Sequence, residues 1–384
     1  MKDALKIAVI GQKGIPARYG GVETHVEQIS TRLAAKGHDV SVYCRNRFRP
    51  PAREVTDSNG FEISDGGLRY RGVRLVFRPS ITTKHLDAAT HSLLCAAETA
   101  LRRSLDIVHF HGIGPAAFAP IPRAAGRTVV STVHALDYRQ AKWGWWARNR
   151  LREGEATAVR RSDGVIAVSR VLAKHIAERY GVAARYIPNG ATVEQPVPPR
   201  RLHEYGLQGN DYILAVGRII PDRGLHHVID AVRRLHKPVK LVIVGTEAPR
   251  TSYSRMLESV ADERVIFTGD LYGEDLAELY SNCRLYVLAS EVEGLPITVC
   301  EAMGYGRAVL LSDIPENREV GGPAAEYFKV HDVSKLTEQL EAMLEDSYDL
   351  GSRGRRGVER VAGHYNWDRL AEEVEGYYYE VLGR

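Results

Sequence analysis

Two glutamates in the second half of the chain, Glu293 and Glu301, have the clearest potential for chemistry. Pro296 is well placed to begin a helix, which leaves Glu293 in the loop before it and Glu301 more than a turn inside it. One carboxylate could then reach a sugar hydroxyl and the other a ribose. Gly294, Leu295 and Pro296 lie at the helix start, where free backbone N–H groups can receive a phosphate. By itself, Glu301 would be interpreted as an ordinary helix glutamate.

Two arginines follow a strand expected at residues 212–216. Gly217 and Arg218 come directly after that strand, and Arg223 follows where a helix is expected to begin. Two cations in these places could clamp both phosphates of a diphosphate, because the planar guanidinium makes bidentate contacts with phosphate oxygens. The alternative is a pair of surface arginines, which is common in a chain this rich in arginine.

A glycine-rich loop at residues 11–23 connects the first expected strand, residues 7–10, to a helix. Its glycines, Gly20 and Gly21 among them, let backbone N–H groups approach a phosphate at a helix N-terminus. The loop matches neither G-x-G-x-x-G nor G-x-x-x-x-G-K-[ST], so it does not predict a dinucleotide or P-loop site. The alternative is a flexible connection between strand and helix.

His134 follows a strand expected at residues 128–132, where it could donate a hydrogen bond to a sugar or phosphate oxygen. A lone histidine is more often structural, so this position is weak evidence by itself. His109 and His111 flank another strand end. Residues two apart share a face only while the strand continues, so we expect at most one of these two to reach a ligand cleft.

Short apolar runs alternate with amphipathic stretches along the whole chain, which predicts two doubly wound α/β domains of Rossmann-like type. The pattern restarts after a proline-rich segment at residues 195–199. We therefore expect a first domain over residues 1–194 and a second over 195–365. Residues 366–384 should form a helix that packs back toward the first domain. The expected strands cover residues 7–10, 40–43, 107–108, 128–132, 165–168, 212–216, 241–244, 265–268, 285–288 and 308–311.

The composition is that of a folded protein, with 44% hydrophobic and 26% charged residues among 384. A net charge of +4 is too small to predict nucleic-acid binding. Four widely spaced cysteines indicate neither a zinc ribbon nor a disulfide framework. Neither a signal sequence nor a membrane span is expected, and a cytoplasmic location fits. Basic clusters at residues 45–49 and 148–152 fit a solvated face and contact with an anionic surface equally well.

In this order, the segments resemble the retaining nucleotide-sugar glycosyltransferases of family 4, which adopt the two-domain GT-B fold. The most specific piece is Glu293 to Glu301, which is similar to the E-x7-E motif of that family and is followed by Ala-Met-Gly-Tyr-Gly at residues 302–306. Supporting pieces are residues 162–169 and the Ile-Pro-Asn-Gly segment at residues 187–190. The resemblance covers nearly the whole chain.

The resemblance implies a role for each candidate residue. Arg218 and Arg223 would bind the donor diphosphate, Glu293 the transferred sugar and Glu301 the nucleotide ribose. His134 would contact the donor sugar, while Gly20 and Gly21 would bring their loop against the phosphates or the acceptor. Because these groups come from both halves, catalysis is expected to require closure of the cleft between them. The family usually has lysine where this chain has Arg223, so charge is kept while reach and hydrogen-bond geometry change.

Residues 11–23, 133–138 and 141–144 resemble more narrowly the bacterial exopolysaccharide and rhamnosyl-type transferases. This implies a nucleotide-diphosphate sugar as donor, a saccharide or lipid-linked saccharide as acceptor, and net retention by front-face substitution. No cofactor is expected. No metal is expected either, because the chain has no D-x-D carboxylate pair and arginines can supply the positive charge.

The segment Trp143, Trp145, Trp146 and Arg148 combines aromatic and basic side chains on the acceptor side. This mixture suits peripheral contact with an anionic membrane, although any single tryptophan is more often part of a core. Two other classes remain as alternatives to transfer. One is a sugar-nucleotide epimerase or phosphorylase of the same fold, and the other is a non-catalytic nucleotide-sugar-binding protein.

Overall fold

The computed structural model describes residues 3–18, 20–64, 66–83, 86–139, 144–246 and 251–384, and the chain divides into two compact units. Unit 1 combines residues 1–189 with 367–384, and unit 2 comprises residues 190–366. The division falls a few residues before the boundary expected at residue 195. The reason is that the intervening segment is bonded to unit 2, where Ala191 bridges Asn366 and the Glu194 N–H donates to the Gly304 carbonyl oxygen over 3.3 Å.

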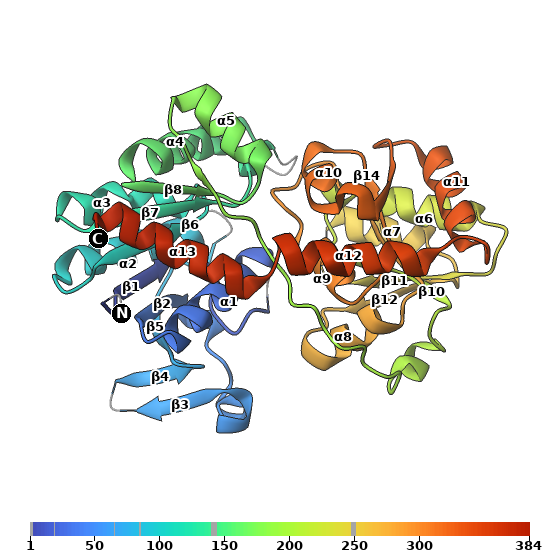
Figure 1. Ribbon diagram of the computed structural model, residues 1–384, viewed down its shortest axis with the longest axis horizontal. Helices are drawn as coiled ribbons and strands as arrows, with labels where there is room; N and C mark the ends of the chain where they lie inside the picture. Colours follow the sequence, from blue (N-terminus) through green and yellow to red (C-terminus); the bar gives the residue numbers. More distant parts are fainter. Residues whose placement is uncertain (1–2, 19, 65, 84–85, 140–143, 247–250) are drawn as a thin grey trace. The chain divides into compact units, whose positions relative to one another are not determined.

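Unit 1 contains a nine-stranded sheet that is parallel except at one edge (Figure 1). The two strands at that edge, β3 and β4, run antiparallel to their neighbours. The central strands are buried along their length and therefore need helices on both faces. In spatial order the strands are β3 (Phe61–Ser64), β4 (Gly67–Tyr70), β5 (Val73–Arg78), β2 (Asp39–Arg45), β1 (Lys6–Ile10), β6 (Ile107–His111), β7 (Thr128–Val133), β8 (Gly164–Ala167) and β9 (Arg185–Tyr186).

The helices of unit 1 pack on this sheet in two groups. The first pairs α1 (Gly21–Ala35) with the C-terminal helix α13 (Trp367–Leu382), so that the two ends of the chain meet in one unit. The second group surrounds the 3-10 helix η4 (Pro115–Phe118) and consists of α2 (Asp87–Leu101), α3 (Pro120–Ala124) and α4 (Trp145–Arg161). Beside α4 lies α5 (Arg170–Tyr180).

Unit 2 contains a six-stranded, wholly parallel sheet. In spatial order its strands are β12 (Val265–Gly269), β11 (Lys240–Val244), β10 (Tyr212–Val216), β13 (Leu285–Leu288), β14 (Val309–Ser312) and β15 (Ala325–Phe328). Its helices are α6 (Leu225–Arg234), α7 (Ser252–Val260), α8 (Gly273–Asn282), α9 (Ile297–Gly304), α10 (Pro315–Gly321), α11 (Val333–Leu344) and α12 (Leu350–His364). In such a sheet the carboxyl ends of all strands share one edge, and ligands bind there.

The structure confirms the doubly wound α/β class and each of the ten expected strands. It adds β3, β4, β5, β9 and β15, which carry no long apolar run: β3, for example, is buried only at its first residue. No helix among the described residues is both long and apolar enough to cross a membrane.

Candidate active site

The two predicted arginines stand at the carboxyl end of β10 in unit 2. Arg218 is exposed, and Arg223 ends the short 3-10 helix η7 (Pro221–Arg223). Gly224 is the N-cap of α6 and has a φ of 63°, in the left-handed region. A side-chain carbon at Gly224 would lie 2.3 Å from the carbonyl oxygen of Ala289. This close approach draws the start of α6 onto the end of β13 and brings Arg223 near the segment that carries Glu293.

Arg218 and Arg223 line one pocket with an empty volume of about 240 Å³, together with Gly217, Ala289 and the ends of β10 and β13. Burial, with the neighbouring charge of Arg218, lowers the pKa of Arg223 to about 10, so Arg223 is still a cation at neutral pH. Two neighbouring cations at a strand end, one exposed and one half-buried, form a site for an anion.

Glu293 is buried, and its carboxylate pairs with the guanidinium of Arg223. The same nitrogen of Arg223, Nη1, donates to Ser290 Oγ over 3.1 Å. The structure therefore joins two residues to which the family resemblance assigns separate tasks. An anion bound to Arg223 would share its guanidinium with Glu293. Binding of the anion at Arg223 would therefore change the charge environment of the Glu293 carboxylate.

Glu301 occupies the middle of α9, whose N-cap is Pro296, and Gly294 and Leu295 are buried just before it. Its Oε2 accepts a hydrogen bond from the hydroxyl of Tyr280 on α8, at 2.9 Å. Burial raises the pKa of the Glu301 carboxyl, and the Tyr280 hydrogen bond partly opposes that effect. Tyr280 is thus a residue of this site that sequence reasoning missed, because nothing in the spacing of α8 relates it to α9.

In unit 1, His134 belongs to a cluster of imidazoles at the carboxyl ends of β6 and β7. His134 Nε2 and His111 Nδ1 share a hydrogen bond of 3.0 Å. His25, from α1, packs edge-on against His134 with ring centroids 4.8 Å apart. Burial lowers the pKa of His25 to about 4 and holds that of His134 well below its usual value. Both rings are consequently neutral near pH 7, so His134 offers one hydrogen-bond donor and one acceptor but carries no charge.

His109 and His111 share a face of β6, with ring centroids 4.1 Å apart. His109 uses both ring nitrogens within the protein, at 2.6 Å from the Tyr378 hydroxyl of α13 and 2.7 Å from Thr132 Oγ1. This leaves His111 as the one that contacts His134. His25 Nδ1 lies 2.9 Å from Asn189 Oδ1, an oxygen that only accepts, so this nitrogen donates. His25, Asn189 and Tyr378 were not among the predicted residues.

The described part of the glycine-rich loop is held by two glutamates of α1. Glu23 accepts the N–H of Lys13 at 3.0 Å, and Glu27 accepts the N–H of Ala17. These contacts argue against the alternative of a flexible connection, and they also occupy two of the N–H groups that a phosphate could have used. Gly20, with a φ of 148°, is the N-cap of α1, and Gly21 is the first residue of that helix. The first N–H groups of α1 therefore remain the anion-binding candidates of this loop.

Two family models together match most of the chain. One, described as Glycosyltransferase Family 4, matches residues 19–195, and the other, described as Glycosyl transferases group 1, matches residues 204–357. The chain is a glycosyltransferase of family 4.

Solved structures of similar fold span the whole glycosyltransferase chain and confirm the GT-B fold. Sucrose-phosphate synthase from Thermosynechococcus elongatus aligns with a TM-score of 0.81 at 20% identity and covers 99% of both chains. Anabaena HepE in complex with UDP-glucose aligns with a TM-score of 0.78 at 17% identity and covers 97% of this chain and 99% of its own.

Curated relatives also match the glycosyltransferase over nearly its full length. A glycogen synthase of Mycobacterium tuberculosis is 27% identical and covers 96% of this chain and 92% of its own. An enzyme of Mycolicibacterium hassiacum named MMP alpha-(1->4)-mannosyltransferase is 24% identical and covers 99% of both chains.

The predicted acceptor-side tryptophans of the glycosyltransferase stand at the start of α4. Trp145 and Trp146 are 64% and 75% exposed and contact each other edge to face, so neither is a core residue. Arg148 is half-buried on the next turn. Trp143 lies outside the described residues. The two described tryptophans therefore form an exposed aromatic pair, which is the arrangement that contact with a lipid surface requires.

Two groups of side chains in the described part of the glycosyltransferase have the spacing to hold a metal ion: His25, His111 and His134 in unit 1, and His227, Glu291 and His331 in unit 2. In unit 1 the His111–His134 hydrogen bond satisfies one nitrogen of each ring without an ion. In unit 2, His227 Nε2 and His331 Nδ1 are likewise bonded to each other, at 3.0 Å.

Proposed function

We propose that this chain is a retaining glycosyltransferase that moves a sugar from a nucleotide-diphosphate donor to a saccharide or lipid-linked saccharide acceptor, in bacterial surface or exopolysaccharide synthesis. The observation that carries the proposal is the pocket at the end of β10. Arg218 and Arg223 line this pocket as a site for an anion, and Glu293 is paired with Arg223. Relatives named as GDP-mannose-dependent mannosyltransferases support a nucleotide-sugar donor.

In the proposed donor complex, the diphosphate lies between Arg218 and Arg223, and the N-terminus of α9 adds its dipole at Gly294 and Leu295. Glu293 accepts hydrogen bonds from hydroxyls of the transferred sugar. Glu301, held by Tyr280, accepts one from the ribose. His134 contacts the donor sugar as a neutral imidazole.

Transfer breaks the bond between the anomeric carbon and a diphosphate oxygen while the acceptor oxygen bonds to the same face of that carbon. The acceptor proton passes to the departing diphosphate, so the enzyme supplies no nucleophile. Negative charge grows on the diphosphate as the bond breaks, and cations beside it stabilise the transition state more than the ground state. The arginines supply that charge, and we propose that no divalent ion is needed.

A thermal-shift series with UDP-, dTDP- and GDP-sugars tests the donor assignment. One nucleotide class should raise the melting temperature, because a ligand that binds only the folded protein stabilises it. Arg218→Gln should abolish that shift, whereas Arg355→Gln, which removes an exposed charge from α12, should leave it intact. The donor assignment fails if no class shifts the melting temperature or if the two variants behave alike.

Slow hydrolysis of the cognate donor tests retention and metal independence in one assay. With water as acceptor, the first sugar released should keep the anomeric configuration of the donor, as read by NMR before mutarotation. The rate should be unchanged by EDTA. Release of the opposite anomer would contradict retention, and loss of the rate with EDTA followed by recovery with one divalent ion would contradict metal independence.

We also propose that the start of α4 touches the anionic surface of a membrane, since Trp145 and Trp146 are exposed beside Arg148. Sedimentation with phosphatidylglycerol vesicles should carry the protein down, and Trp145→Ser with Trp146→Ser should reduce the bound fraction severalfold. Ile63→Ser, on the far hairpin, removes an equally exposed apolar side chain as the control. Equal binding by the control and the double variant would rule out this contact.

A further inference from the structure

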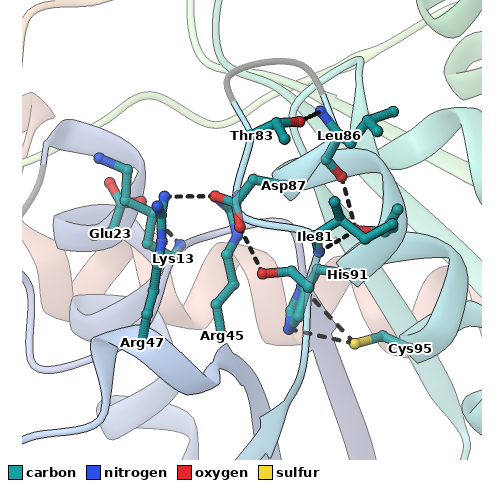
Figure 2. Close-up of polar contacts among 12 residues, drawn as sticks. Lys13, Glu23, Arg45, Arg47, Ile81, Thr83, Leu86, Asp87, His91 and Cys95 are labelled. Atoms are coloured by element: carbon teal, nitrogen blue, oxygen red, sulfur yellow. Dashed lines mark hydrogen bonds and ion pairs between the residues drawn. The ribbon is translucent and has the colours of Figure 1, made fainter.

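Two arginines of the basic cluster at residues 45–49 converge on one carboxylate (Figure 2). Arg45 Nη1 and Arg47 Nη2 both lie 2.6 Å from Asp87 Oδ2. Ser80 Oγ donates to the other oxygen of Asp87, also at 2.6 Å. One negative charge therefore faces two positive ones, and the cluster carries a net positive charge.

The cluster has hydrogen-bonding capacity that the described residues do not use. Arg45 is 7% exposed, and its Nε, although buried, has no hydrogen-bond partner within the described part of the chain. A buried donor without a partner costs roughly 1–3 kcal/mol, so a shift that let Arg45 Nε donate to a bound anion would recover that free energy. The side chain of Arg47 is 44% exposed, which makes it the member that solvent and ligands can reach.

The electrostatic environment is positive around the cluster. Burial lowers the pKa of the neighbouring His91 to about 4, and the charge of Arg45 is the next cause, ahead of the opposing effect of Asp87. Asp87 is the first residue of α2, so the N-terminal dipole of a four-turn helix adds to the same potential. Burial opposes ionisation of Asp87, but Ser80 and the two arginines outweigh it and hold its pKa below the usual value.

The cluster adjoins the loop that was expected to face phosphates or the acceptor. The backbone N–H of Arg45 donates to the carbonyl oxygen of Lys13 in the glycine-rich loop, at 2.9 Å. Lys13 Nζ and the Arg47 guanidinium both lie against the ring of Phe48, at 5.7 and 4.6 Å from its centroid. Because β2 is parallel to β1, β6 and β7, its carboxyl end shares a sheet edge with the segment that carries His134.

Apolar side chains border the same place. Ile81 and Leu86, labelled beside Asp87 in Figure 2, are 54% and 47% exposed. An apolar part of a ligand bound at the charge cluster would cover these two side chains.

We propose that Arg45 and Arg47, with Lys13, form a subsite for a phosphoryl group on the acceptor, and that Ile81 and Leu86 contact an apolar chain attached to that group. The inference rests on the proposed function, because it assigns the chemical class of the acceptor. Ionised Asp87 keeps the two guanidinium groups together in the free enzyme. The phosphoryl oxygens bind to the N–H groups that Asp87 leaves unused, above all those of the exposed Arg47, so that a dianion is held by charge-assisted hydrogen bonds.

Hydrogen–deuterium exchange of the full chain with inorganic pyrophosphate as probe tests the subsite. Peptides covering residues 45–49 and 80–83 should exchange more slowly with the probe. Arg47→Gln should weaken this protection by about tenfold in pyrophosphate concentration, the size of one lost charge-assisted contact. Arg53→Gln, an equally cationic and exposed neighbour, should behave like the unaltered chain. Protection confined to peptides near Arg218 and Arg223, or equal protection in both variants, would overturn the subsite.

A second arm separates a lipid phosphate from a water-soluble one. Decyl phosphate below its micelle concentration should protect the same peptides at lower concentration than inorganic phosphate, and Ile81→Ser with Leu86→Ser should remove that advantage. Equal potency of the two probes would overturn the apolar contact and leave a subsite for a soluble phosphate. None of these readouts uses transfer, so a chain that binds no donor can still show the subsite, and a working transferase can lack it.

Discussion

At the scale of single residues, the main result is that candidate groups are coupled in pairs. Arg223 holds Glu293, Tyr280 holds Glu301, and His111 holds His134. A substitution at one member therefore changes the partner as well, and the effects within each pair should not be additive.

Arg223 offers a direct test, because its Nη1 contacts Glu293 and Ser290 together. Arg223→Lys keeps the charge and should lower kcat/KM by about tenfold or less, whereas Arg223→Gln should lower it by roughly a hundredfold or more, the usual loss when a donor to a developing negative charge is removed. Steady-state kinetics with the cognate donor would measure both. Equal losses would show that geometry at this position matters more than charge.

Tyr280 should act on donor affinity rather than on the chemical step. Tyr280→Phe removes the hydrogen bond to Glu301 and leaves a buried carboxylate without that donor, so the donor KM should rise about threefold to tenfold with kcat nearly unchanged. Tyr305→Phe removes a hydroxyl from the ring that stacks on Tyr280 and serves as control. A fall in kcat at constant KM would place Glu301 in the chemistry instead.

At the scale of elements, the site of unit 2 depends on how closely α6 approaches β13. Gly224 permits this contact for two reasons, its left-handed φ and the absence of a side chain facing Ala289. Helix α9 contributes in a different way, since it holds Glu301 inside the helix and leaves Glu293 in the loop before it. The position at which α9 begins therefore places the two glutamates in different elements, one in a loop and one in a helix.

Gly224→Ala should destabilise the protein by about 2 kcal/mol or more, because it adds a clash with backbone to the cost of a left-handed alanine. Gly181→Ala is the matched control: Gly181 has a φ of 66°, close to the 63° of Gly224, but open space where the side chain would go. It should cost about 1 kcal/mol. Urea unfolding compares the two, and equal losses would mean that α6 can shift to relieve the clash.

At the scale of the whole molecule, the buried histidines should set the stability of the chain towards acid. Burial lowers the pKa of His25 and of His91 from 6.5 to about 4. The unfolded chain binds protons at these positions below pH 6.5 while the folded chain does not. Proton binding by these two histidines therefore favours the unfolded chain as pH falls from 6.5 towards 4. The free energy of unfolding should decrease over that range and be independent of these groups above pH 6.5.

Urea unfolding of the full chain between pH 7.5 and 4.5 should show this loss. His91→Gln should reduce its slope, since one group with a lowered pKa is removed. His236→Gln, at a side chain that is 95% exposed, should leave the slope as it is. A pH dependence that is identical in all three proteins would contradict the role given to His91.

Much of the architecture follows from the sequence alone. Short, mainly apolar runs identified ten strands, because a strand buried on both faces is apolar along most of its length. Five strands at or near sheet edges, β3, β4, β5, β9 and β15, escaped prediction, since strands that are partly exposed lack that signature. The sequence also predicted candidate ligand-binding residues after the strands, from Gly217 and Arg218 to Glu293 and Glu301. This was possible because ligands bind at the carboxyl ends of the strands in an α/β sheet.

Only the tertiary structure decided which of these groups touch. His25, Asn189 and Tyr378 come from segments far apart in the chain, yet they surround the histidines that end β6 and β7. Asp87 likewise turns a basic sequence, interpretable as a solvated face, into a charge cluster with an unused donor. Local periodicity reports how each segment is buried, whereas side-chain contacts depend on strand order, register and helix packing, which are set by the whole chain at once.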